Sequence, residues 1–251
     1  MNDLFIMRAQ LLLIFILATL LLQSCSSIYM PNVPATPMFK NAGEGYVSAH
    51  ANLKGNVSAT AGVAVSNHLA ILANGSIIDN QRSNPRFKQK LGEAALGYYT
   101  TMGTEKRQVL EFYGGYGLGR TMQTDVRASI SGYDEIESRD MSFDKIFVQI
   151  NYSSTRRNKI KLFGSQRELN YGTAIRVSRL QMTDFSINGL SSPLEENLFV
   201  EPIFFTRMEL SKGFQLQYTT GFNIGIIDNT YLEAGNSVFT LGLTYNFGRK
   251  K

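Results

Sequence analysis

The sequence predicts an all-β chain that closes into an antiparallel, up-and-down β-barrel of about ten strands. Apolar and polar residues alternate with a period of two from residue 44 almost to the end, as in strands with one apolar and one polar face. The alternating segments are about ten residues long, which is the length a tilted strand needs to cross a bilayer. The connections between them alternate between short and long, as in outer-membrane barrels.

Composition supports one large β domain. The 251 residues include 22 Gly, 16 Phe and 12 Tyr but no Trp, whereas helical enzymes usually carry more Ala, Leu, Glu and Lys. The net charge of +5 is modest, and the basic residues are spread from Arg82 to Lys251. Because they form no basic stripe, the sequence argues against nucleic acid as a partner.

The clearest strand is the last, residues 237–247. Its apolar face carries Phe239, Leu241, Leu243, Tyr245 and Phe247. The preceding segment, 214–224, repeats the alternation. A soluble sandwich or a lipocalin-like barrel has the same period but turns its apolar face to a core. The direction of Phe239, Leu241 and Leu243 therefore decides between a membrane span and a soluble cavity.

The remaining strands and connections follow from the same period. Strands are expected near 45–53, 56–65, 69–78, 88–100, 107–120, 142–153, 168–180 and 197–210. Short connections are expected near 66–68, 101–106 and 211–213, and long ones near 79–86, 121–141, 181–196 and 226–236. The basic stretch 154–167 forms either a short helix or an extension of its neighbour. Since a sheet in lipid leaves no edge unpaired, the first strand should pair with the last.

The amino terminus has the order of a secretory signal. Residues 9–22, AQLLLIFILATLLL, follow Arg8 and lead into small polar residues. This run is short for a membrane helix, which needs about 20 residues. A buried core helix is the alternative, but a segment that is apolar all round lacks the polar stripe of such helices. Residues 1–24 are therefore predicted to be a signal peptide.

Leu22-Gln23-Ser24-Cys25 resembles the lipobox of bacterial lipoproteins and lies at the end of that apolar run. The resemblance implies that the lipoprotein processing machinery adds fatty-acyl chains such as palmitate to Cys25, which becomes the first residue of the mature chain. Two or more acyl chains give lasting membrane anchorage. In lipoproteins of this kind, a residue such as Ser26 in place of Asp after the cysteine implies the outer membrane. As the only cysteine, Cys25 has no partner for a disulfide within the chain.

Residues 25–43 contain Pro31, Pro34 and Pro37 among small and polar residues, which predicts an extended tether without a core. The barrel domain is expected at 44–251. Lipobox, tether and alternating strands together make the sequence similar to the outer-membrane β-barrel lipoproteins of Bacteroidetes-type bacteria. This resemblance implies a place and a fold, with outer-membrane lipid and the barrel assembly machinery as partners. An anchor in the periplasmic leaflet would place the start of the first strand and the carboxyl end on that side.

Charged residues on the polar face of the strands should point into the lumen, because they are costly against lipid. Six are assigned to this lumen network: Glu93, Glu111, Arg176, Glu201, Arg207 and Glu209. We expect opposite charges to brace a narrow lumen filled by side chains, since about ten strands leave little room for an aqueous channel. A selectivity constriction or a catalytic carboxylate pair is the functional alternative.

Three further motifs bear on function. Glycines 115, 117 and 119 of EFYGGYGLG share a face with Glu111 and make room for bulky neighbours, since no phosphate-loop context follows. Ser48 and His50 share a face and are weak candidates for acyl chemistry, with no third member evident. The acidic stretch 133–140 is expected to be a solvated outer loop, with calcium or ligand capture as the alternative. No metal site and no cofactor are predicted.

The leading hypothesis is a non-enzymatic, lipid-anchored outer-membrane β-barrel with a structural or surface-interaction role. One alternative is a lipocalin-like binder of an apolar ligand, tethered in the periplasm. The other is a membrane-embedded acyl hydrolase or acyltransferase, for which Ser48 and His50 are the candidates.

Overall fold

The computed structural model describes residues 28–52, 55–82, 84–103, 105–129, 132–162, 164–233 and 237–248. The predicted signal peptide and Cys25 lie outside the described residues. Ten long strands form the barrel: β1 (Gly45–Ala51), β2 (Asn56–Ala64), β3 (Leu69–Asn80), β4 (Arg86–Met102), β5 (Gln108–Ser129), β6 (Gly132–Thr155), β9 (Leu169–Ile187), β11 (Glu196–Ser211), β12 (Phe214–Phe222) and β14 (Ser237–Phe247). Four short strands lie at the ends: β7 (Ile160–Leu162), β8 (Ser165–Arg167), β10 (Leu190–Ser191) and β13 (Ile224–Gly225). This described part of the chain contains no helix long and apolar enough to cross a membrane.

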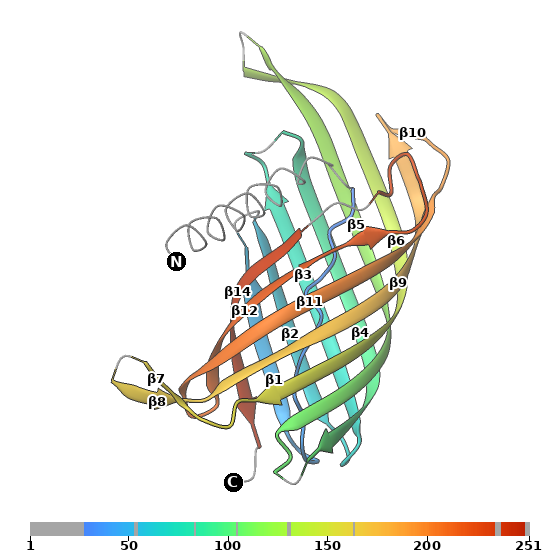
Figure 1. Ribbon diagram of the computed structural model, residues 1–251. Helices are drawn as coiled ribbons and strands as arrows, with labels where there is room; N and C mark the ends of the chain where they lie inside the picture. Colours follow the sequence, from blue (N-terminus) through green and yellow to red (C-terminus); the bar gives the residue numbers. More distant parts are fainter. Residues whose placement is uncertain are drawn as a thin grey trace, which may run out of the picture.

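The ten long strands close into one antiparallel barrel (Figure 1). They pair in chain order, and β1 pairs with β14 from Gly45 opposite Phe247 to Ala51 opposite Leu241. The predicted strand number and the predicted pairing of first with last strand are both confirmed. Because the barrel is closed, each of its strands has a hydrogen-bonded neighbour on both sides, as a sheet in lipid requires.

The apolar face of the last strand points outward. Phe239, Leu241 and Leu243 are 58%, 56% and 53% exposed on the outside of the barrel. On the opposite face of this strand, Thr240 and Thr244 are buried on the lumen side. The other strands follow the same pattern, with exposed outer side chains that include Ile71, Leu96, Phe112, Ile150 and Phe204. The apolar face of the sheet thus points away from the lumen, as a membrane span requires.

The two ends of the barrel differ. At the short-turn end lie the turns at 65–68 and 212–213 and the end of β14, together with one longer connection that carries β7 and β8. At the loop end lie the connection 188–195 and residues 223–233, while β5 and β6 are joined there by a two-residue connection. At the loop end the β5–β6 hairpin projects beyond the other strands (Figure 1).

Two predicted connections were wrong. Most of 121–141 belongs to β5 and β6, including the acidic stretch 133–140, because cross-strand ion pairs such as Arg139 with Asp125 (3.3 Å) join two polar strands into a ribbon. In 181–196, β9 continues to Ile187 and pairs with β10. The uncertain stretch 154–167 carries the β7–β8 hairpin in place of a helix.

Residues 28–41, here named the lumen strap, run through the barrel from the loop end to the short-turn end (Figure 1). Ile28 packs in a cluster with Phe185 and with Leu232 of the loop end. Phe39 packs with Tyr46, near the start of β1 at the short-turn end. Most residues of the strap are buried inside the barrel, so this part of the expected tether packs against the lumen walls.

The glycines of β5 make room for neighbouring lumen side chains. A Cβ atom at Gly119 would lie 2.2 Å from Cζ of Phe143, and one at Gly117 would lie 2.9 Å from Cγ of Glu93. Phe143 belongs to β6 and Glu93 to β4, the two neighbours of β5. The prediction that this stripe accommodates bulky neighbours is confirmed.

Gly115 and Gly114 provide a matched test of the stripe. A Cβ at Gly115 would lie 2.4 Å from Cζ of Phe147 and 2.6 Å from the carbonyl oxygen of Ala94, whereas a Cβ at Gly114 meets nothing within 4 Å. We expect Gly115→Ala to lower the free energy of unfolding by about 1–3 kcal/mol through overpacking, and Gly114→Ala to have little effect. Urea titration of the folded, heat-modifiable gel band measures both. Equal midpoints for the two variants would contradict this packing.

Candidate functional site

Four buried charged side chains meet inside the barrel. Glu93 of β4 lies 3.1 Å from Nη1 of Arg176 on β9 and 3.2 Å from Nζ of Lys145 on β6. Lys145 also reaches Glu201 of β11 at 3.2 Å. None of the four is more than 5% exposed. Two carboxylates and two cations therefore balance in a site that excludes water, where an unmatched charge costs several kcal/mol.

The first half of the lumen strap is bound to this charged group. The hydroxyl of Tyr29 accepts a hydrogen bond from Lys145 (2.7 Å) and donates one to Glu201 (3.3 Å). The side chain of Gln89 takes both backbone groups of Met30, accepting from its N–H at 2.9 Å and donating to its carbonyl at 2.6 Å. The strap thereby gains from one glutamine the two bonds that a neighbouring strand would otherwise supply.

The second half of the strap is held by other lumen residues. The carbonyl of Ala35 accepts hydrogen bonds from Gln149 (2.8 Å) and Asn151 (2.9 Å). Nη2 of Arg207 donates to the carbonyl of Thr36 at 2.7 Å and to its hydroxyl at 2.9 Å. These bonds explain why an extended segment without regular secondary structure is stable in the lumen, since buried backbone groups need partners.

Glu111 contacts the strap near the short-turn end. Its carboxylate accepts hydrogen bonds from the backbone N–H of Phe39 (3.4 Å), from Asn151 (3.0 Å) and from Tyr113 (3.1 Å). A buried carboxylate that accepts three hydrogen bonds is a structural support, and its oxygens are directed at the chain itself.

Five of the six residues assigned to the lumen network from the sequence are buried in the lumen. The sixth, Glu209, follows Arg207 on the same face of β11, opposite the buried Gln215. It lies partly exposed near the turn at 212–213, and its backbone N–H bonds to the carbonyl of Glu168 (3.0 Å). Near this turn the strand is irregular, with a bulge between Glu209 and Ser211.

Lys145 and Gln149 were missed. The signal was present, since both alternate along β6 with the exposed Ile146, Val148 and Ile150.

Ser48 and His50 lie two residues apart on the lumen face of β1. Both are buried, and the ring of His50 packs over Gly242 of β14. Within the described part of the chain, neither Ser48 Oγ nor His50 Nε2 has a hydrogen-bond partner, and no carboxylate bonds to His50. An activated serine needs contact with a base that a third group orients, and the three are not brought together here.

The acidic outer hairpin is neutralised by arginines. Glu135 lies 3.7 Å from Arg86, and Arg139 contacts both Asp125 and Glu137. Across the residues that the structure describes, no three His, Cys, Asp or Glu side chains are grouped to hold a metal ion.

Comparison with known proteins yields weak structural likenesses. No protein-family model matches the sequence, and no curated protein matches it. The translocator domain of the autotransporter NalP from Neisseria meningitidis is 12% identical with a TM-score of 0.35, covering 81% of this chain and 86% of that one. The match to the FpvAI–pyocin S2 complex (9% identity, TM-score 0.27) covers 85% of this chain and 42% of that one. A ferric enterobactin receptor mutant from Pseudomonas aeruginosa (12% identity, TM-score 0.24) is likewise covered over 42%, against 81% of this chain.

The fold is that of an outer-membrane-type β-barrel. The strand pairing, the apolar outer face and the buried charged and amide side chains of the lumen establish this architecture from the chain itself.

Lys145 provides a test of the buried charged group. We expect Lys145→Met to lower the free energy of unfolding by about 3–5 kcal/mol, because it leaves Glu201 buried without its cation. The double variant Lys145→Met/Glu201→Gln should regain part of this loss, since it removes the stranded charge. Arg179→Met serves as a control, because the Arg179–Glu196 pair is exposed on the outer face. Urea unfolding at the same midpoint as the parent would show that Lys145 does not brace the lumen.

Proposed function

We propose that this protein is a non-enzymatic lipoprotein that spans the outer membrane as a β-barrel closed by its own amino-terminal strap. The observation that carries the proposal is the strap itself, which occupies the lumen and bonds to its charged and amide side chains. A barrel filled in this way has a structural or surface-interaction role and does not conduct solutes. The outward apolar face supports the membrane span over the lipocalin-like alternative, which needs an apolar cavity inside.

The strap changes where the acyl chains on Cys25 would lie. In outer-membrane barrels the short turns face the periplasm and the long loops face outward. In that orientation the described strap begins on the outer side, at Ile28. Cys25 lies three residues earlier in the sequence. Three residues of extended chain reach about 10 Å, whereas the hydrocarbon core of a bilayer is about 30 Å thick.

The lipid is therefore proposed to lie in the leaflet at the loop end. The strap separates Ile28 from Gly45 by the height of the lumen. We therefore place the amino end of the mature chain on the side of the membrane opposite the start of β1, in place of the same side expected from the sequence. The anchor then fixes the entry of the strap into the lumen. This role differs from membrane residence, which the barrel already supplies.

Cys25→Ser tests whether the barrel spans the membrane without its acyl chains. We expect the variant to stay in the membrane fraction after an alkaline carbonate wash, because the strands alone hold the protein in the bilayer. The parent protein and a periplasmic lipoprotein with its cysteine replaced are the two controls. Release of Cys25→Ser into the soluble fraction would reject the spanning barrel in favour of a tethered one.

Cysteine labelling tests orientation and lumen closure together. In intact cells, a membrane-impermeant maleimide should label Asp228→Cys at the loop end but neither Lys212→Cys at the short-turn end nor Thr36→Cys in the lumen. After lysis Lys212→Cys should react, because both Lys212 and Asp228 are exposed, whereas the fully buried Thr36→Cys should react only after unfolding. The parent shows the background from Cys25. Labelling of Thr36→Cys in the folded protein would contradict a closed lumen.

A further inference from the structure

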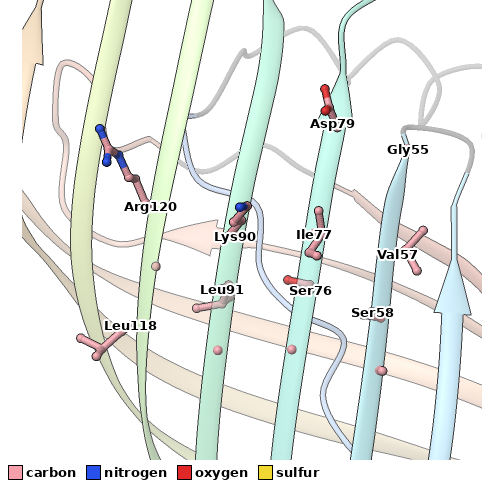
Figure 2. Close-up of a pocket in the computed structure, with 14 residues that line it drawn as sticks. Gly55, Val57, Ser58, Ser76, Ile77, Asp79, Lys90, Leu91, Leu118 and Arg120 are labelled. Atoms are coloured by element: carbon pink, nitrogen blue, oxygen red, sulfur yellow. The ribbon is translucent and has the colours of Figure 1, made fainter.

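The outer face of β2, β3, β4 and β5 has a groove of about 960 Å³ (Figure 2). Its floor is formed where Ala59 pairs with Gly75 and Gly75 pairs with Gly92 across three neighbouring strands. Elsewhere on the outer face, large side chains such as Leu96 stand exposed. The short side chains leave a trough in the surface, with Leu118 of β5 opposite Gly92 at one end.

The side of the groove toward the loop end changes from apolar to basic along one row of paired residues. Val57 is paired with Ile77, Ile77 with Lys90, and Lys90 with Arg120. Figure 2 shows Lys90 and Arg120 above Leu91 and Leu118, on neighbouring strands. Lys88 lies one step nearer the loop end and lines an adjoining hollow of about 210 Å³ together with Lys90 and Arg120.

Acids also lie beside these cations. Arg120 donates to Asp140 at 3.0 Å, and Asp79, which accepts from Gln81 at 2.7 Å, is opposite Lys88 in the pairing of β3 with β4. Within the described residues, Lys88 and Lys90 form no ion pair. Cations at the border of an apolar outer face lie at the level of lipid headgroups, where they attract an anionic surface.

We propose that this groove binds a phosphorylated membrane lipid. Its phosphate lies against Lys88, Lys90 and Arg120, and an acyl chain lies along the floor of Gly75 and Gly92. The charge favours an anionic headgroup, and the apolar trough continues from the basic end toward the middle of the outer face. The proposal rests on the proposed function, because it requires the outer face to lie in a bilayer.

The charge test uses the full chain reconstituted in phosphatidylcholine vesicles that contain a minor share of phosphatidylglycerol, followed by native mass spectrometry of the released protein. We expect phosphatidylglycerol to be retained in preference to phosphatidylcholine. Lys88→Gln/Lys90→Gln should lower that preference about thirtyfold, which corresponds to about 1 kcal/mol for each cation near an anionic headgroup. Lys159→Gln/Lys212→Gln, which removes two exposed lysines at the short-turn end, should leave it unchanged.

The shape test fills the groove without changing charge. A Cβ at Gly92 and one at Gly114 both meet nothing within 4 Å, but only Gly92 lines the groove. Gly92→Leu should abolish the retained lipid, whereas Gly114→Leu on the neighbouring strand should preserve it. Both variants keep the barrel fold, which the heat-modifiable gel band reports.

The outcomes separate this inference from the proposed function. Insertion without a phosphatidylglycerol preference, or a preference that survives Lys88→Gln/Lys90→Gln, overturns the lipid site and leaves the spanning barrel intact. A dimer of the parent that Gly92→Leu converts to a monomer also overturns it, because a second copy of the chain then fills the groove. Failure of the parent to insert into either vesicle type overturns the spanning barrel, and the lipid site with it.

Discussion

The buried ion pairs among Glu93, Lys145, Arg176 and Glu201 are the interaction on which the rest of the structure depends. They join β4, β6, β9 and β11 across the lumen and supply the partners of Tyr29 in the strap. Buried ion pairs add little stability compared with an apolar core, but removing one member is costly because the other charge stays buried. The group therefore specifies one arrangement of the strap among the many that a proline-containing segment can adopt.

The strap fills space that would otherwise be left empty inside the closed barrel. The bilayer requires a closed sheet with an apolar outside, so polar and small side chains must face inward. On β1, β2 and β3 these include Ser48, Ser58 and Ser76, which are too short to meet the opposite wall. The interior of a protein is close-packed, and the strap supplies the missing volume with Tyr29, Met38 and Phe39.

The features predicted correctly from the sequence depend on the local alternation of residues. The features missed depend on contacts with residues that are distant in the chain. Alternation identified all ten barrel strands and their faces, because lipid outside and polar lumen inside act on every second residue. The strap was assigned as a tether, since its proline and small residues are those of a linker. Its burial depends on Gln89, Gln149 and Arg207, which lie far from it in the chain. The long β5–β6 hairpin was not predicted for the same reason, because cross-strand ion pairs between residues apart in the chain join its two polar strands.

The path of the strap constrains the order in which the barrel forms. The strap enters the lumen at the loop end and leaves it beside the start of β1, which pairs with β14 to close the sheet. On the proposed lipidation, Cys25 carries acyl chains that a filled, polar lumen does not admit. The strap must then lie against β4, β6 and β11 before β1 meets β14, so that the last strands close around it. The buried ion pairs join β4, β6, β9 and β11 only, so they are free to hold the strap while β1 and β14 are still apart.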